Sequence, residues 1–270
     1  MNPEESVKRL KSWFEAYVDQ FASNDPRVQE NMDMKRWHTR RVCAAILDIG
    51  DSLKLSREDL CTAEITGWLH DIGRFEQYTR YGTFADHRSE DHAALGVKVM
   101  HDTRILEKIG AVDNEIIIRV VGAHNRAALP DQEDDRVLFF LKLLRDADKI
   151  DVLGVVTGYY QKAGHERNHT LELDLPDRPH VSDPVYEALM NGRLVRMADL
   201  KTINDFKLLQ MAWIYDINFP RTFEMVREKG YLEILRDALT HSSNRTAQVY
   251  RRARAHLDRH CSGDKAAHGT

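Results

Sequence analysis

The chain has 270 residues, of which 42% are hydrophobic and 8% aromatic, enough for one large hydrophobic core with an extension. Its formal net charge of −4 argues against nucleic acid or an anionic membrane surface as a partner. No run of about 18 apolar residues occurs in the sequence, which argues against a membrane-spanning helix.

The cysteines and the N-terminus bear on where the protein is located. Cys43, Cys61 and Cys261 form no paired motif, which is typical of a reducing compartment. The first 21 residues carry acidic side chains and lack the apolar stretch of a signal peptide. The sequence therefore predicts a cytoplasmic protein.

Apolar residues recur at steps of three and four along most of the chain, which predicts amphipathic helices. Residues 115–124 are rich in β-branched side chains, but Ile117 and Val121 lie at helical spacing, so we expect a helix there too. In chain order, the pattern predicts helices at 5–21, 33–49, 58–72, 89–101, 113–124 and 134–162.

The pattern changes near residue 164. Residues 164–194 concentrate histidines, acidic residues and prolines, and we expect an irregular excursion there. Helical periodicity resumes at 199–219, and residues 222–260 are predicted to form two more helices. We predict an all-α fold with a helical core at 1–163, a helical extension packed on the core at 164–260, and a flexible tail at 261–270.

Several polar residues stand within apolar helical segments, where burial is costly unless their side chains are paired. Histidine and carboxylate side chains suit divalent ions such as manganese, iron, nickel or zinc. A helical bundle can bring one ligand from each of several helices to a common point. The residues of this kind are His38, His70, Asp71, His92, His124 and Asp148.

The order of His38, the doublet His70–Asp71, and Asp148 in DADKID resembles the H…HD…D motif of the HD-domain superfamily of metal-dependent phosphohydrolases. The resemblance runs from about residue 30 to 160 and implies an HD-domain helical bundle, with the C-terminal helices expected to flank the metal cleft. It implies that Asp148, rather than Asp146 or Asp151, is a metal ligand. His92 and His124 fall where binuclear members carry two further histidines, which implies a site for one or two ions, with a hydrogen-bonded helix-end histidine as the alternative at each position.

This resemblance implies hydrolysis of a phosphoester by a metal-bound hydroxide that attacks phosphorus. The expected substrate is a small phosphorylated, nucleotide-like mono- or diester, with Asp71 positioning the nucleophile. Arg74 follows the doublet where many members carry a lysine or arginine, and it is the first candidate to bind phosphate, with a solvated helix-end arginine as the alternative. Asn125 is either a substrate ligand or a cap of its turn, and Lys149 either a substrate ligand or a structural partner of Asp148.

Two other functions stay open at this stage. Some proteins of this superfamily hold two irons with the same six ligands and oxidise a C–H bond with dioxygen. A catalytically silent HD domain can also serve as a sensor or scaffold, although the intact ligand set argues against this alternative. The sequence does not decide between a monomer and a homo-oligomer.

Overall fold

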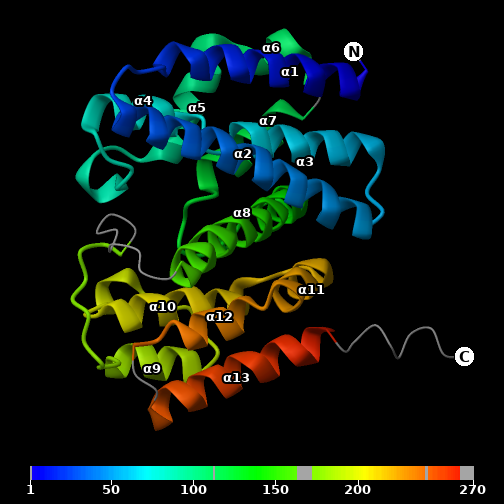
Figure 1. Ribbon diagram of the computed structural model, residues 1–270. Helices are drawn as coiled ribbons and strands as arrows, with labels where there is room; N and C mark the ends of the chain where they lie inside the picture. Colours follow the sequence, from blue (N-terminus) through cyan, green and yellow to red (C-terminus); the bar gives the residue numbers. More distant parts are fainter. Residues whose placement is uncertain (1, 112, 163–171, 241–242, 262–270) are drawn as a thin grey trace, which may run out of the picture. The chain divides into compact units, whose positions relative to one another are not determined.

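The computed structural model describes residues 2–111, 113–162, 172–240 and 243–261. These residues form α-helices and short 3₁₀ helices, and no strand occurs among them (Figure 1). The predicted all-α fold is therefore confirmed. Within the same residues, no helix is both long and apolar enough to cross a membrane.

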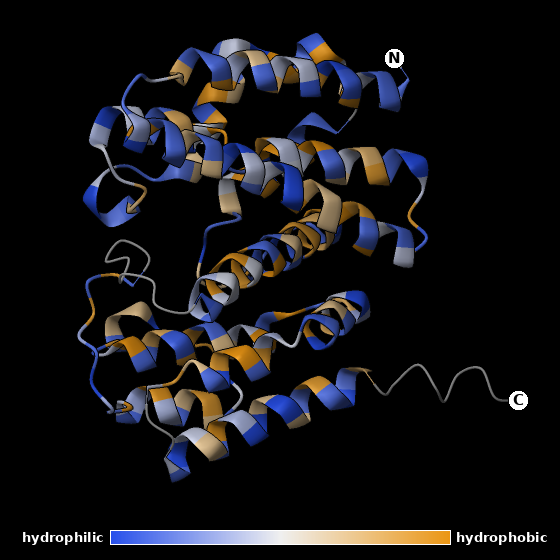
Figure 2. Ribbon diagram, viewed as in Figure 1, coloured by the Kyte–Doolittle hydropathy of each residue, from blue (hydrophilic) through white to orange (hydrophobic). Residues whose placement is uncertain are grey.

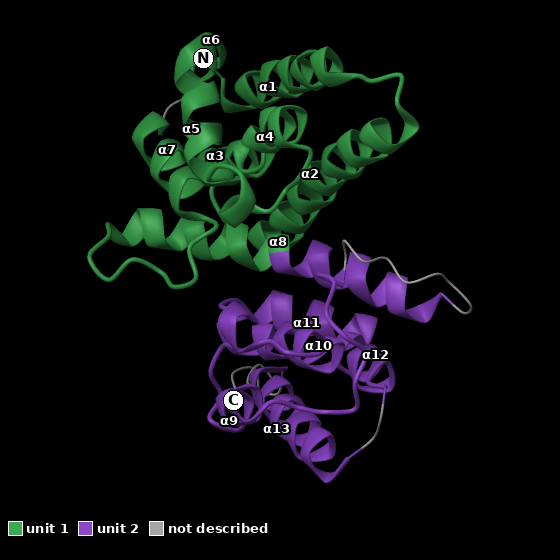
Figure 3. Cartoon of the chain, turned by 90° about the vertical axis from the view of Figure 1, so that its left-hand side faces the viewer, with its two compact units in different colours: residues 1–148 green, residues 149–270 purple. Residues whose placement is uncertain are grey.

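The chain divides into two compact units, residues 1–148 and 149–270 (Figure 3). The division falls inside the long helix α8 (Asp135–Gln161). The expected boundary after residue 163, and the packing of residues 164–260 on the metal cleft, stay predictions. The predicted tail is described only at Cys261, and residues 262–270 lie outside the described residues.

Unit 1 is a stack of helices around a core of apolar side chains that includes Leu10, Phe14, Leu69 and Phe75, all fully buried. Within it, the second helix packs on the third, the first on the third, the fourth on the fifth, and the fifth on the seventh. Figure 2 shows hydrophobic and hydrophilic residues mixed along each helix, as amphipathic helices require. These helices are α1 (Pro3–Val18), α2 (Pro26–Ser52), α3 (Arg57–Leu69), α4 (Gly73–Tyr81), α5 (His92–Thr103), α6 (Ile105–Ile109), α7 (Asn114–Ala123) and the first part of α8.

The helix predicted at 58–72 is shorter than expected. It ends at Leu69, and His70, Asp71 and Ile72 form a turn before α4 begins at Gly73. Helix α3 packs mainly on α1 and α2, and α4 mainly on α5. The His70–Asp71 doublet therefore lies at a junction between two helices.

Unit 2 has a core of its own, built around Val185, Leu208, Leu235 and Val249. The prediction of an irregular excursion is wrong for residues 183–190, which form a helix with Pro184 in its first turn, a position where proline is tolerated. The prediction of two helices in 222–260 is also wrong, because Gly230, with a φ of +65°, ends one helix early and a further helix follows. The unit contains α9 (Asp183–Met190), α10 (Ile203–Ala212), α11 (Pro220–Lys229), α12 (Tyr231–Asp237) and α13 (Asn244–Cys261).

Candidate metal centre

The six predicted ligands come together within unit 1. Five of them are at most 6% exposed, and His70 is completely buried. Asp148 is the exception, with a side chain that is 33% exposed. The six are His38 of α2, His70 and Asp71 of the turn after α3, His92 at the start of α5, His124 at the end of α7, and Asp148 of α8.

Asp71 lies between two pairs of histidines. Its Oδ2 atom is 3.4 Å from His38 Nε2 and 3.7 Å from His70 Nε2. Its Oδ1 atom is 3.5 Å from His92 Nε2 and 3.8 Å from His124 Nε2. One carboxylate thus faces the Nε2 atoms of two pairs of histidines, as a ligand that bridges two metal ions would.

We call these two sets the first and second ligand groups. The first group contains His38, His70 and Asp71, and Asp148 belongs beside it because its Oδ1 atom is 3.3 Å from His38 Nε2. The second group contains Asp71, His92 and His124. Each group offers a set of nitrogen and oxygen atoms that could hold one divalent ion.

The hydrogen bonds of the second group fit a bound cation. His92 Nδ1 donates to Asp86 Oδ2 at 2.7 Å, and His124 Nδ1 donates to the backbone oxygen of Val121 at 2.7 Å. A neutral ring that is protonated at Nδ1 carries a lone pair at Nε2. The two Nε2 atoms lie 3.1 Å apart, so two neutral rings protonated at Nδ1 would point two lone pairs at one place, where a metal ion could accept both.

In the first group, His70 has the same arrangement. His70 Nδ1 donates to the backbone oxygen of Gly67 at 2.8 Å, so its Nε2 atom is the acceptor. That atom lies 3.2 Å from His38 Nε2. Spacings of this size suit two ligands of one ion whose bonds are about 2.0–2.2 Å long. The residues present therefore fit one or two divalent ions.

The electrostatics keep these side chains in the forms that bind metals. Burial lowers the pKa of His70 to about 4, so its ring is neutral near pH 7. Burial alone would raise the pKa of Asp71, but the positive charges of Lys35 and Arg74 outweigh it and hold this pKa well below its usual range. The pKa of Asp148 is also lowered, against the effect of burial, by a hydrogen bond from His38 Nε2, whose proton would be lost on binding a metal ion.

Two cationic side chains contact Asp71, one at each oxygen. Lys35 Nζ is 2.7 Å from Oδ2, and Arg74 Nε is 3.4 Å from Oδ1. Lys35 was not predicted from the sequence, although it precedes His38 by three residues and so shares its face of the helix. Both cations lie in unit 1 and help to neutralise the buried carboxylate.

Asp86, in the segment between α4 and α5, was also overlooked. It accepts hydrogen bonds from His92 Nδ1 at 2.7 Å, Gln77 Nε2 at 2.8 Å and Arg74 NH1 at 3.0 Å. With Asp91 and His92 it forms a further His/Asp group. The Oδ1 atom of Asp91, however, caps α5 by accepting from two backbone N–H groups, which indicates a structural role.

The predicted substrate-binding residues have protein partners. Arg74 NH1 donates to Gln77 Oε1, to the backbone oxygen of Phe84 and to Asp86. Asn125 Nδ2 donates to Asp91 Oδ1 at 2.8 Å, which ties the end of α7 to the start of α5. Lys149 pairs with Asp216 at 2.7 Å within unit 2. The contacts to substrate that we expect from these three residues stay predictions.

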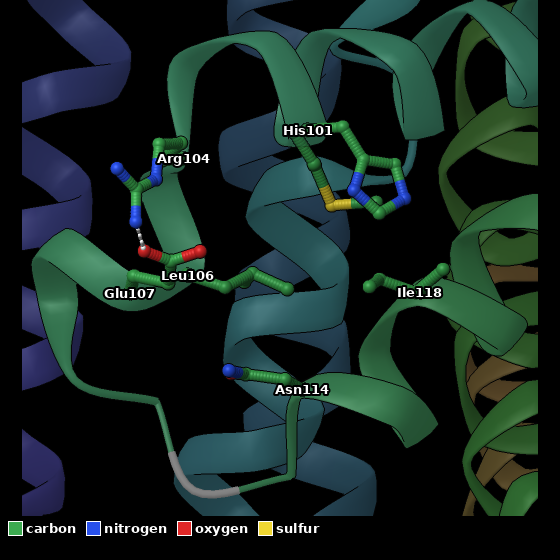
Figure 4. Close-up of a pocket in the computed structure, with 7 residues that line it drawn as sticks. His101, Arg104, Leu106, Glu107, Asn114 and Ile118 are labelled. Carbon is green, nitrogen blue, oxygen red and sulfur yellow. Dashed lines mark hydrogen bonds and ion pairs between the residues drawn. The ribbon is translucent and has the colours of Figure 1, made fainter.

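A separate hollow of about 130 Å³ lies at the other end of α5 (Figure 4). Its lining includes His101, Arg104, Glu107 and Asn114 and none of the six predicted ligands, and Arg104 and Glu107 pair with each other beside it. Because His101 lies nine residues after His92, it is about 13 Å further along the helix. This hollow is therefore not part of the metal centre.

Residues 37–153 match a family model described as the HD domain. The match spans all six predicted ligands, from His38 to Asp148, and confirms the resemblance inferred from the motif. Comparisons with curated proteins and with solved structures found no match.

Proposed function

Since this chain carries an HD domain, a domain typical of metal-dependent hydrolases, we propose that it hydrolyses a phosphoester of a small, nucleotide-like metabolite. The observation that supports this most is the position of Asp71, whose two oxygens each face a pair of histidines. A carboxylate shared in this way is suited to hold two ions close together, the arrangement used for in-line displacement at phosphorus.

Ions in the two groups would supply Lewis acidity, which lowers the pKa of water and neutralises phosphoryl oxygens. Asp71 would link the two ligand groups, and the buried histidines would exclude bulk solvent from the ions. Asp148 is the most exposed of the six residues, so a substrate can approach beside it. Arg74 can reach a phosphate through NH2, because its NH1 group is held by Gln77, Phe84 and Asp86.

The test is to replace Asp71 by alanine and to measure metal content and turnover together. Wild-type protein loaded with manganese, nickel or zinc should cleave members of a panel of phosphomonoesters and phosphodiesters. The Asp71→Ala variant should lose both bound metal and turnover, because both ligand groups lose their shared oxygen donor. Asp102→Ala is the matched control, since this exposed aspartate of α5 pairs only with Lys98 among the described residues. An Asp71→Ala variant with full activity would refute the proposal.

An oxygenase reaction is the alternative function. It is supported by the second ligand group, because His92 and His124 complete a set of six residues that could hold two irons. Two irons per chain with oxygen uptake would support it. Turnover of a phosphoester with manganese or nickel under anaerobic conditions would support the hydrolase. Bound metal with no turnover on either panel would support a sensor or scaffold. A cytoplasmic location and a small-molecule partner, rather than a membrane or nucleic acid, belong to the hydrolase proposal.

A further inference from the structure

Lys35 is held against the metal centre by very few contacts. Its side chain is 16% exposed, and its Nζ atom lies 2.7 Å from Asp71 Oδ2. The ring of Phe84 lies beside it, with its centroid 5.4 Å from Nζ. Among the described residues, Asp71 is the acceptor that Lys35 uses.

Arg74, the second cation at Asp71, is held far more firmly. Its Nε atom faces Asp71 Oδ1, and its NH1 group donates to Gln77, to the backbone of Phe84 and to Asp86. Moving Arg74 would break several hydrogen bonds at once. Moving Lys35 would break one ion pair and its contact with the Phe84 ring, and its flexible four-carbon stem allows the ammonium to move away. Lys35 is therefore the exchangeable cation of the two.

The position of Lys35 puts it in competition with an ion of the first ligand group. The Asp71 oxygen that accepts from Lys35 is also the oxygen that faces His38 and His70. A divalent ion held by that group needs the same oxygen, and it repels an ammonium group close to it. An isolated buried carboxylate is strongly unfavourable, so some cation must accompany Asp71 whether or not an ion is bound.

We propose that Lys35 is an exchangeable counter-ion of Asp71: it neutralises the carboxylate when the first ligand group is empty, and an incoming metal ion displaces it so that it can donate to the phosphate group of the substrate. The first step concerns the metal centre alone. The second step rests on the proposed function.

The first step is tested by titrating metal-free protein with Mn²⁺ in a calorimeter. Lys35→Met should bind Mn²⁺ about tenfold more tightly than wild type, because the competing cation is gone. Lys35→Arg should bind it more weakly than wild type, because a guanidinium holds a carboxylate with two parallel hydrogen bonds. Arg36→Met is the matched control: Arg36 is the next residue of α2 and pairs with Asp19 and Glu15, so its loss should leave the affinity unchanged.

A merely structural role for Lys35 predicts the opposite result. Lys35→Met would then bind Mn²⁺ more weakly than wild type or with the same affinity, and either outcome overturns the first step. If Lys35→Met does not fold without metal, the comparison of wild type with Lys35→Arg decides, because equal or tighter binding by Lys35→Arg overturns the proposal.

The second step is tested with inorganic phosphate as the probe, added to Mn²⁺-saturated wild type and Lys35→Met. Phosphate should bind about tenfold more weakly to the variant, since one charge-assisted hydrogen bond is lost. Equal phosphate affinity overturns this step. If both affinity shifts occur but wild type cleaves no phosphoester, the exchange stands and the proposed hydrolase function fails.

Discussion

Each histidine of the two ligand groups whose Nδ1 contact is described is oriented by an acceptor behind its ring. For His70 and His124 this acceptor is a backbone oxygen three residues earlier, at Gly67 and Val121. For His92 it is the side chain of Asp86. The orientation of His92 therefore depends on a residue that can be replaced without changing the backbone or any ligand.

Replacing Asp86 by alanine should weaken metal binding in the second ligand group and spare the first. Loss of such a carboxylate behind a ligating histidine costs about 10–100-fold in metal affinity. Elemental analysis at limiting metal should then find about one ion per chain where wild type holds two. Asp102→Ala, on the exposed face of α5, should retain the wild-type content. Equal loss from both groups, or no loss at all, would show that Asp86 does not act through His92.

The residues of the candidate metal centre could be identified from the sequence because a histidine or aspartate within an apolar helical segment is conspicuous. His38 and His124 are examples, and both are buried at the centre. Asp86 could not be predicted in this way, because it lies in a short 3₁₀ helix between α4 and α5 where no apolar periodicity marks which side chains point inward. Lys35 was missed for a different reason, since a lysine on a helix usually lies in solvent.

At the scale of elements, the metal centre depends on how closely α4 approaches α5. Gly73 begins α4 directly after the turn that carries His70 and Asp71, and a Cβ atom at this position would lie 2.4 Å from the backbone oxygen of His92 and 2.6 Å from the backbone nitrogen of Gly96. Backbone atoms cannot move aside as the end of a flexible side chain can. The glycine therefore brings His92 within reach of Asp71.

Replacing Gly73 by alanine should push α4 and α5 apart and separate His92 from Asp71. We expect a loss of about 1–3 kcal/mol in the free energy of unfolding, as is usual for overpacking, together with loss of the ion in the second group. Denaturant unfolding and elemental analysis measure the two effects.

Gly96→Ala is the matched control for this element. Its Cβ would meet atoms no closer than 3.5 Å, which is ordinary contact, and alanine is the better helix former. Stability equal to or above wild type is expected for this variant. Equal damage in both variants would show that the close approach at Gly73 is not what matters.

The positions of the helices could be predicted from the sequence only where one apolar stripe marks the helix. Helices α2, α5, α7 and α8 were all predicted with the right type, at shifted ends. Helix α9 was missed because three prolines and several charged residues precede its short apolar stripe of Val185 and Leu189. The break at Gly230 was missed because the apolar stripe continues on both sides of it, at Val226 and Leu232.

At the scale of the whole molecule, the two units differ in whether they contain side chains that could bind a metal ion. Every His/Asp group that could hold an ion among the described residues lies in unit 1, residues 1–148. Unit 2 has its own core, with Leu208, Phe223 and Val249 fully buried or nearly so. Binding to the native state stabilises only what unfolds together with the site.

Removal of metal should therefore lower the unfolding temperature of unit 1. At an ion concentration about 100 times the dissociation constant, binding contributes about 2.7 kcal/mol, which corresponds to about 5–10 °C for a unit of this size. Trp13, Trp37 and Trp68 lie in unit 1 and Trp213 lies in unit 2, so the fluorescence of a Trp213→Phe variant reports on unit 1 alone. Its thermal transition should fall when a chelator is added, whereas the same transition with Asp71→Ala also present should not move. An unchanged transition in Trp213→Phe would mean that the two ligand groups hold no ion that stabilises the fold.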